Sequence, residues 1–379
     1  YHYSDNEVYG FSHTHLSGTG VSDYGDILLM PTTGEILLTN GSNGTEGYKS
    51  KFSHQNETAR AGYYSVTLED YNIDVELTVS KRAGFHKYTF NTDKESQLIL
   101  DLEHRDKLTS SNIEVVSNNN IQGWRHSSNW AADQRLYFYI QFSEDISEII
   151  YREDSLVAAF KFGEIENQLL VKIGISAISI ENAKENLETE IPHWDFNKTL
   201  SETTNQWEKE LSKIQIETND ETKKEIFYTA LYHSLLNPNL FTDVNGDYLG
   251  TDLQTHNTSE TQYTIFSLWD TYRATHPLFT LIQERKTLEF IQTFLRQYKD
   301  GGQLPVWELA ANYTGCMIGY HSIPVILDAY VKGISNFDTK LALEAMVHSA
   351  NQNHLGLKQY KENGFISASD EPESVSKTL

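Results

Sequence analysis

The spacing of apolar residues changes once along the chain. Up to about residue 185, short apolar or alternating runs recur at near-regular intervals with turn residues between them, which is typical of β-strands. From about residue 181 onward the apolar residues follow a helical period, among many good helix formers. The pattern predicts a β domain followed by an α domain, in a multidomain β + α chain of 379 residues.

The first part of the chain reads as ten or more strands. A hairpin is expected where two apolar runs flank Thr32-Thr33-Gly34, and a turn is expected at Asn118-Asn119-Asn120. We expect strands at 27–30, 36–38, 63–69, 74–80, 85–90, 98–102, 113–116, 136–142, 157–162 and 169–175. Short strands with turn signals at this spacing predict an antiparallel β-sandwich over residues 1–180.

The second part predicts helices. Residues 181–217 are expected to form linker helices, and residues 218–379 a helical domain. A capping box at Thr218 to Glu221 opens the next helix, which Asn237-Pro238 ends. Further helices are expected at 268–283, 286–299, 319–333 and 338–351, and the first turns of another at 373–379. That last pattern has no stop signal, so we expect the numbered chain to end inside a domain.

Composition narrows the class of partner. The chain carries 30 Lys and Arg residues against 53 Asp and Glu residues, a balance that repels nucleic acid and anionic lipids. No apolar run is long enough to span a membrane. Cys316 is the only cysteine, which rules out an internal disulfide. The chain opens at Tyr1 rather than Met, which is compatible with removal of an export signal and an extracytoplasmic location.

The stretch from Gly301 to Ser322 is the first candidate site. It interleaves Trp307, Glu308 and His321 with glycines and apolar residues, the mixture expected where a concave surface grips a polar ligand. We interpret it as one wall of a sugar-sized pocket. The alternative is a helix entry in which Trp307 fills the core and Glu308 is solvated.

The stretch from Ser267 to Arg273 is the second candidate. At the start of a helix, Asp270 and Arg273 could pair and leave Trp269 as a flat platform beside a carboxylate. A hexose ring requires such a platform. The alternative is an intrahelical salt bridge next to a core tryptophan.

Two further motifs suggest metals only weakly. His13 and His15 would share one face of an extended segment, but no third ligand lies nearby for zinc, so hydrogen-bonded structural histidines are favoured. The stretch Asp243 to Asp247 lacks the register of a calcium loop, and a plain Asn-Gly turn is favoured there.

Three motifs together resemble glycoside hydrolase family 92, the calcium-dependent exo-α-mannosidases. They are 10–20 with 23–26 (GFSHTHLSGTG and DYGD), 267–273 (SLWDTYR), and 307–322 (WELAANYTGCMIGYHS). The resemblance runs from the first residues of the chain to the last. It implies an N-terminal β-sandwich joined through helices to an (α/α)6 barrel, of which this chain would hold the first part.

The resemblance also implies a function. Family members release terminal α-linked mannose with inversion and use a bound calcium, so we expect an inverting exo-α-mannosidase, with α-1,2 preference, that acts on mannose-containing glycans such as N-glycans. The family's general acid, base and most calcium ligands lie in later motifs that do not occur before Leu379. No catalytic or metal-binding residue is therefore expected in this chain.

What this chain is expected to supply is sugar binding. The resemblance assigns that role to Trp269 and Asp270, with Gly10 and Phe11 from the sandwich. Arg273, Glu308 and His321 are further candidates for substrate contact or support. The alternatives are a carbohydrate-binding or scaffold protein without catalysis, and another (α/α)6 glycosidase.

Overall fold

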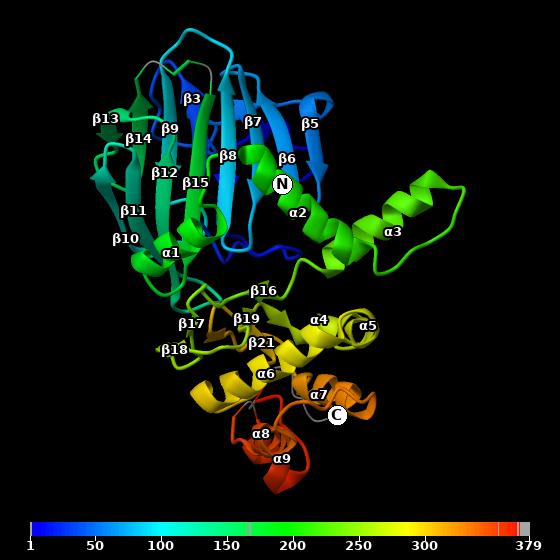
Figure 1. The fold of residues 1–379 in the computed structure, drawn as a ribbon. Coiled ribbons are helices and arrows are strands. Elements are labelled where there is room, and N and C mark those ends of the chain that lie inside the picture. The colour runs from blue at the N-terminus through cyan, green and yellow to red at the C-terminus, as the bar shows by residue number, and fades with distance from the viewer. Residues whose placement is uncertain (1, 164, 167, 355, 370, 372–379) are drawn as a thin grey trace. The chain divides into compact units, whose positions relative to one another are not determined.

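The computed structural model describes residues 2–163, 165–166, 168–354, 356–369 and 371. The chain divides into two compact units (Figure 1). Unit 1 comprises residues 1–215 with 243–245, and unit 2 comprises residues 216–242 and 246–379. The predicted order of a β region followed by a helical region is confirmed.

Unit 1 consists mainly of two antiparallel sheets. The larger has eight strands in the order β10-β11-β12-β15-β8-β7-β6-β5, and the smaller has five in the order β13-β14-β9-β3-β2. The strands of the larger sheet are β5 (Glu57–Arg60), β6 (Tyr63–Leu68), β7 (Ile73–Val79), β8 (Ala83–Phe90), β10 (Lys107–Ser117), β11 (Asn120–Ser128), β12 (Gln134–Phe142) and β15 (Gln168–Ser176). Those of the smaller are β2 (Phe11–Ser12), β3 (Leu28–Thr33), β9 (Ser96–Asp101), β13 (Ile146–Tyr151) and β14 (Val157–Phe162). A short pair, β1 (Glu7–Val8) with β4 (Ser50–Lys51), and a 3-10 turn at His54–Asn56 complete the β region.

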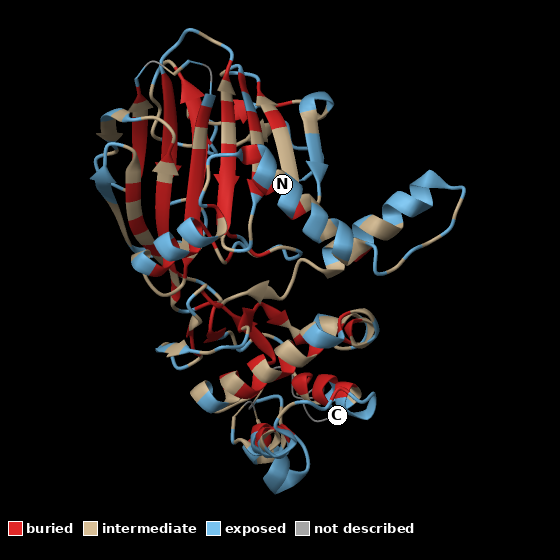
Figure 2. Cartoon of the chain, viewed as in Figure 1, coloured by how far each residue is buried: buried red, intermediate tan, exposed pale blue. Residues whose placement is uncertain are grey.

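The central strands of the larger sheet are apolar on both faces. Tyr88 and Phe138 belong to the large apolar core that includes both sheets, whereas Phe85 and Tyr139 belong to a second cluster with helical residues. Successive side chains of a strand point to opposite faces, so this alternation explains the continuous apolar runs. Figure 2 shows most of the length of these strands as buried.

Two helices cover the second face of the larger sheet. They are α1 (Ile180–Glu190), which packs on β15 and β12, and α2 (Phe196–Leu211), which packs on β7 and β8. Ser179 and Asp195 cap their N-termini through side-chain oxygens that accept backbone N–H groups. Figure 1 shows both helices lying across this face. The helices expected in the 181–217 linker therefore belong to unit 1.

Several strand predictions need correction. The predicted hairpin partner 36–38 is not a strand, and β3 instead pairs with β2 and β9. Gly34 does end β3 with a positive φ of 83°. Sequence reasoning missed β5 and β11, because their polar composition hides the alternation, and it also missed β13, although most of its residues are apolar. The turn at Asn118 to Asn120 is confirmed, since it joins β10 and β11.

Unit 2 combines helices with small sheets. Its helices are α3 (Glu221–Ser234), α4 (Leu268–Thr271), α5 (Thr275–Ile282), α6 (Glu284–Gly301), α7 (Ser322–Val331), α8 (Thr339–Asn351) and α9 (Leu357–Asn363). Its strand pairs are β16 (Asn239–Leu240) with β19 (Tyr263–Thr264), and β17 (Asp247–Leu249) with β18 (Thr255–Asn257). A three-stranded sheet contains β20 (Phe266–Ser267), β21 (Trp307–Leu309) and β22 (Asn312–Tyr313). Apolar residues of α5, α6, α7 and α8 form its core.

The helix boundaries differ from prediction in three places. The N-cap of α3 is Asp220, whose side chain accepts the Lys223 N–H, so the capping box predicted from Thr218 does not form. The helix expected over 268–283 is broken after Thr271, and α7 begins only at Ser322. The helix predicted at 373–379 lies outside the described residues. No helix among the described residues is long and apolar enough to cross a membrane.

The packing of α1 on β15 depends on a missing side chain. A Cβ on Gly174 would lie 2.1 Å from the Ala183 carbonyl oxygen and 2.7 Å from Leu187 Cβ. We predict that Gly174→Ala lowers the free energy of unfolding by about 1–3 kcal/mol, because α1 must move away from the sheet. Gly20→Ala is the matched control, since a Cβ there meets nothing within 4 Å. Denaturant unfolding of both variants tests this, and equal stabilities would contradict it.

Candidate functional site

The three-stranded sheet of unit 2 brings the two candidate stretches together. Phe266 pairs with Glu308 and Ser267 with Trp307, and the Leu268 N–H donates to the Val306 carbonyl at 3.2 Å. The segment that carries Trp269 and Asp270 therefore starts directly from the strand that pairs with β21. Residues some 40 positions apart in sequence are joined by backbone hydrogen bonds.

His321 packs between two aromatic rings of the other stretch. Its ring centroid lies 5.1 Å from that of Trp269 and 4.3 Å from that of Tyr272, and both contacts are edge-on. Burial lowers the pKa of His321, and the positive charge of Arg273 lowers it further, so the ring is neutral at pH 7. His321 Nδ1 is buried without a hydrogen-bond partner among the described residues. Trp269 remains 41% exposed, so its indole is a surface platform held by a buried neighbour.

Asp270 and Arg273 do not pair, which corrects one sequence interpretation. The Ser267 hydroxyl donates to Asp270 Oδ2, and the Arg273 guanidinium lies 5.0 Å from the Tyr272 ring centroid. The reason is that α4 ends at Thr271, so the three-residue helical spacing is lost. Both charged side chains are exposed.

The backbone carbonyl of Trp307 accepts hydrogen bonds that fix the segment after β22 in the first candidate stretch. It accepts the Thr314 hydroxyl at 2.8 Å and the Thr314 N–H at 3.2 Å, and the same hydroxyl accepts the Cys316 N–H at 3.1 Å. Trp307 itself is 3% exposed and Cys316 is half-buried. Trp307 thus fills the interior, as the alternative interpretation had it, although on a strand rather than at a helix entry.

Glu308 is buried and does not reach the surface. It is 2% exposed, and its Oε1 accepts the Thr264 hydroxyl at 2.8 Å and the Ala311 N–H at 2.7 Å. Burial raises the pKa of its carboxyl to about 7, although hydrogen bonds from Thr264 and Ala311 oppose the rise. Glu308 is therefore not solvated, which corrects the alternative interpretation, and its burial favours support of the site over direct substrate contact.

Gly10 and Phe11 lie in unit 1, where packing explains why a glycine and an aromatic ring stand at these positions. Gly10 has a φ of 145°, and a Cβ there would lie 2.7 Å from Leu28 Cγ. Phe11 is 7% exposed and belongs to the large core cluster. The Phe11 ring is thus part of the sandwich core, and the assignment of Gly10 and Phe11 to substrate binding stays a prediction.

His13 is part of a buried chain of hydrogen bonds. Its Nδ1 lies 2.6 Å from the Ile27 carbonyl oxygen, and its Nε2 lies 3.0 Å from His86 Nε2. His86 Nδ1 in turn lies 2.6 Å from the Tyr88 hydroxyl. Since His13 donates to the carbonyl, neutral rings require that His86 donate to His13 and accept from Tyr88. This arrangement leaves His13 no lone pair for zinc, and the structural interpretation holds.

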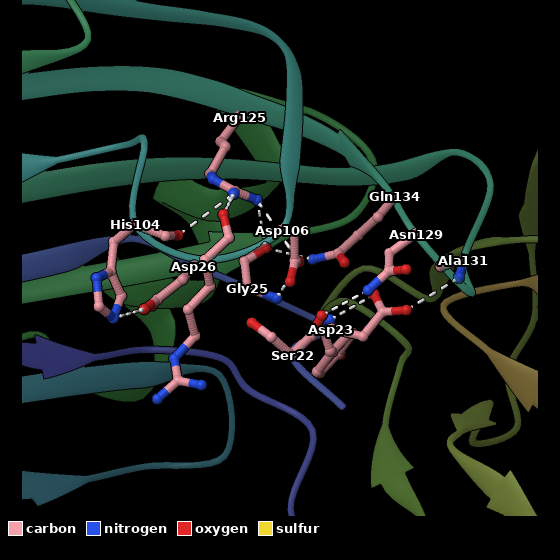
Figure 3. Close-up of polar contacts among 12 residues, drawn as sticks. Ser22, Asp23, Gly25, Asp26, His104, Asp106, Arg125, Asn129, Ala131 and Gln134 are labelled. Carbon is pink, nitrogen blue, oxygen red and sulfur yellow. Dashed lines mark hydrogen bonds and ion pairs between the residues drawn. The ribbon is translucent and has the colours of Figure 1, made fainter. Parts of the chain in front are cut away.

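Figure 3 shows a second polar network in unit 1 that sequence reasoning missed. Arg125 on β11 is fully buried and donates to the carbonyl oxygens of Leu102, Gly25 and Arg105, each at 2.7 Å. Asp106 accepts the Gly25 N–H at 2.7 Å and lies 3.9 Å from the guanidinium. A buried cation is tolerated where hydrogen bonds satisfy it. Here it fixes the glycine-containing loop before β3.

Two aspartates fix the rest of the same loop. Asp23 accepts the Trp130 N–H at 2.7 Å, and Asp26 accepts the Ser12 hydroxyl at 2.5 Å. Burial raises the pKa of Asp26 to about 7. The acidic residues of this motif therefore fix the backbone of the loop. In the sequence, the feature that could have revealed them was their alternation with glycine and serine.

The Asn-Gly turn is confirmed, but its neighbour Asp243 has an unexpected role. Gly246 adopts a φ of 90°. Asp243 is buried and accepts hydrogen bonds from the Ser176 hydroxyl at 2.6 Å and from the side-chain amides of Asn182 and Asn186 at 2.9 and 2.6 Å. Its carboxylate accepts hydrogen bonds within the fold, which agrees with the interpretation of this stretch as a plain turn.

The chain matches two family models that together cover almost all of it. Residues 1–176 match the glycosyl hydrolase family 92 N-terminal domain, and residues 182–379 match the glycosyl hydrolase family 92 catalytic domain. The chain therefore belongs to glycosyl hydrolase family 92.

Solved structures give the same result. A family GH92 alpha-mannosidase from Bacteroides thetaiotaomicron is 35% identical, with a TM-score of 0.92 over 100% of this chain and 55% of that one. A family GH92 inverting mannosidase from the same organism is 27% identical, with a TM-score of 0.89 over 100% of this chain and 54% of that one. These matches confirm the β-sandwich followed by part of an (α/α)6 barrel.

A curated relative is described as an uncharacterized secreted glycosidase of Arthroderma benhamiae. It is 26% identical over 421 residues, which cover 96% of this chain and 49% of the relative. The chain thus spans about half the length of the relatives that it matches.

The buried histidine chain predicts an acid-sensitive fold. Burial lowers the pKa of His13 from 6.5 to about 4, so between these values the unfolded chain binds a proton that the folded chain does not. Stability should therefore fall as the pH drops from 6.5 to 4, by about 3 kcal/mol at most, since one pKa unit corresponds to about 1.4 kcal/mol. His13→Asn keeps a donor for Ile27 and should flatten this dependence. Denaturant unfolding at several pH values tests it, with exposed His2→Asn as control. A slope unchanged in His13→Asn would count against the assignment.

Proposed function

We propose that the complete protein containing this chain is a calcium-dependent, inverting exo-α-mannosidase that releases terminal α-1,2-linked mannose from glycans such as N-glycans. The chain described here supplies sugar-binding residues. Membership of family 92 and the 35% identity to an alpha-mannosidase carry this proposal. A structure of that same type of mannosidase is a complex with mannoimidazole, which supports a mannose-shaped substrate. A family relative described as inverting supports inversion.

The geometry around Trp269 suits one part of that task, the binding of the sugar. The exposed indole of Trp269 can stack on the apolar face of a pyranose ring, and Asp270 beside it can accept hydrogen bonds from ring hydroxyls. His321 contacts the indole edge-on. Arg273 is exposed two residues beyond α4 and can donate to a hydroxyl or an adjoining sugar. The chain thereby holds and orients the sugar.

In this proposal, the general acid, the general base and the residues that bind calcium belong to other parts of the complete protein. The described residues hold no group of three or more His, Cys, Asp or Glu side chains that could bind a metal ion. The proposal itself assigns no residue of this chain to calcium. When bound, calcium would polarise the sugar hydroxyls that it contacts. An inverting enzyme also needs two carboxyl groups roughly 6.5–9.5 Å apart with water between them.

An extracytoplasmic location is part of the proposal. It is supported by the description of one relative as a secreted glycosidase. Fractionation of the native host with an antibody against this chain checks it.

The first prediction concerns the reaction itself. The complete protein should release mannose from α-1,2-mannobiose as the β-anomer first, and a chelator should abolish turnover until calcium is restored. Proton NMR of the fresh product and activity with and without chelator measure both. An α-anomer would exclude inversion, and turnover unaffected by chelation would exclude calcium dependence. Mannoside binding without turnover would favour the carbohydrate-binding alternative, and a preference for another sugar would favour another (α/α)6 glycosidase.

The second prediction separates sugar binding from structure. Asp270→Ala in the complete protein should lower kcat/KM by about 100-fold, because charged hydrogen bonds in a desolvated site contribute about 1.5–3 kcal/mol. The Tm should not change, since Asp270 is exposed and its printed side-chain hydrogen bond is a local one from the Ser267 hydroxyl. Asp328→Ala, which breaks the exposed ion pair with Lys332, is the matched control and should leave kcat/KM unchanged. Near-normal turnover in Asp270→Ala would remove Asp270 from the site.

A further inference from the structure

His321 is a buried side chain whose ring nitrogens form no hydrogen bond with any described residue. The residue is 8% exposed, and its Nδ1 is fully enclosed without a partner. A buried polar atom without a partner costs free energy, so its presence in a folded protein needs a reason. A ligand that forms a hydrogen bond with the other ring nitrogen would supply one.

Three neighbours explain why Nδ1 is enclosed. Trp269 and Tyr272 contact the imidazole edge-on, and Gly319 approaches it closely. A Cβ on Gly319 would lie 2.3 Å from His321 Cε1 and 2.7 Å from its Nδ1. Gly319 also has a φ of 93°, a conformation that glycine adopts without steric cost. The backbone of Gly319 therefore occupies the space beside Nδ1.

The second nitrogen, Nε2, lies in a different environment. It is not one of the enclosed polar atoms, and no described residue forms a hydrogen bond with it. The position of a Gly319 Cβ would be 3.3 Å from Nε2, farther than from the other two ring atoms. Nε2 is therefore the polar atom of this side chain that solvent or a ligand can reach.

The imidazole is held in place before any ligand arrives. His321 directly precedes α7, and its carbonyl oxygen accepts the Val325 N–H at 3.5 Å. Its ring is packed against Trp269, whose indole is 41% exposed. A side chain that is already fixed loses little conformational freedom on binding, which favours affinity. The reachable nitrogen and the exposed indole thus belong to two side chains in direct contact.

A neutral imidazole nitrogen suits a hydroxyl group. Burial lowers the pKa of His321, and the charge of Arg273 lowers it further, so the ring is neutral at pH 7. In a neutral ring, Nε2 either donates or accepts a hydrogen bond, depending on the tautomer. A hydroxyl can pair with both tautomers, whereas a carboxylate or an ammonium group can pair with only one. A pyranose offers hydroxyls around a ring whose apolar face can stack on an indole.

We propose that His321 contacts the sugar directly, through a hydrogen bond between its Nε2 and a hydroxyl of the pyranose that stacks on Trp269. The indole binds the apolar face of the sugar, and the imidazole selects one hydroxyl at its edge. No covalent bond is made or broken by His321. The identity of the sugar as mannose rests on the proposed function, whereas the contact with a pyranose hydroxyl does not.

Three substitutions in the complete protein separate the ring from its nitrogens. His321→Phe keeps an aromatic ring but has no nitrogen. His321→Gln can place an amide near the position of Nε2, whereas the shorter His321→Asn reaches only the position of Nδ1. We expect kcat/KM on an aryl α-mannoside to fall at least 10-fold in His321→Phe and His321→Asn, and less than 3-fold in His321→Gln.

His348→Phe is the matched control for the change from imidazole to phenyl. His348 is exposed on α8 and contacts Tyr298 edge-on at 5.6 Å, so its replacement should leave kcat/KM unchanged. A His321→Phe variant within 3-fold of wild type would overturn the proposal, because the ring alone would then be sufficient. Equal losses in His321→Gln and His321→Asn would also overturn it, because they would show no hydrogen bond at the position of Nε2.

Removal of single hydroxyls from the substrate identifies the group that His321 contacts. With the monodeoxy forms of the same α-mannoside, the loss of one particular hydroxyl should lower kcat/KM at least 10-fold in wild type and less than 2-fold in His321→Phe. Two groups in direct contact show such non-additive effects. Additive losses for every hydroxyl would overturn the proposal, because His321 would then act on the sugar only through other residues.

Two further measurements do not depend on turnover. The Tm of His321→Phe should equal or exceed that of wild type, because carbon replaces an unpartnered polar atom. A lowered Tm with unchanged sugar affinity would show a structural role only and would overturn the proposal.

The second is the Kd, measured by ligand-observed NMR, of the methyl α-glycosides of mannose, glucose and galactose. In a protein inactive on mannosides, weaker binding of the glucoside or the galactoside by His321→Phe than by wild type would refute the proposed function alone. If wild type bound none of the three, both proposals would be overturned.

Discussion

The pairing of β21 with β20 is the constraint on which the candidate site depends. This ladder is only two residues long, yet it joins the Trp269 segment to the stretch that ends at His321. Such a short ladder is stable only when its surroundings are ordered, and here the surroundings are a buried carboxyl and an aromatic core. The exposed platform is therefore attached to buried, hydrogen-bonded neighbours.

Both units use buried polar side chains to fix irregular backbone. In unit 1, Arg125 holds the carbonyl groups of a glycine-containing loop, and in unit 2, Glu308 holds the amides of a tight turn. Asp243 does the same between a strand end and a helix. A buried polar group without partners is costly, so each of these side chains selects one loop conformation over the alternatives. Loops with exposed binding residues gain rigidity from such anchors.

Periodicity predicted the elements well where one face of an element is clearly apolar. The strands around Phe85 and Phe138 and the long helix before Gly301 are examples. It failed where the pattern was mixed: residues 36–38 are apolar but form no strand, and β11 is polar but is paired on both sides in the larger sheet. The family motifs located Trp269 and Asp270, but they gave no information on which motif residues face the interior.

The sequence by itself determined the order of a β region and a helical region, the membership of family 92, and the stretches that form the candidate site. Those features follow from local spacing and from motifs that can be read along the chain. Only the tertiary structure decided that Glu308 is enclosed, that Phe11 is part of a core, and that Asp270 is separated from Arg273. The physical reason is that burial and charge state depend on neighbours distant in sequence. Thr264 and Gln297 determine the environment of Glu308, and the sequence around position 308 does not predict that either residue lies beside it.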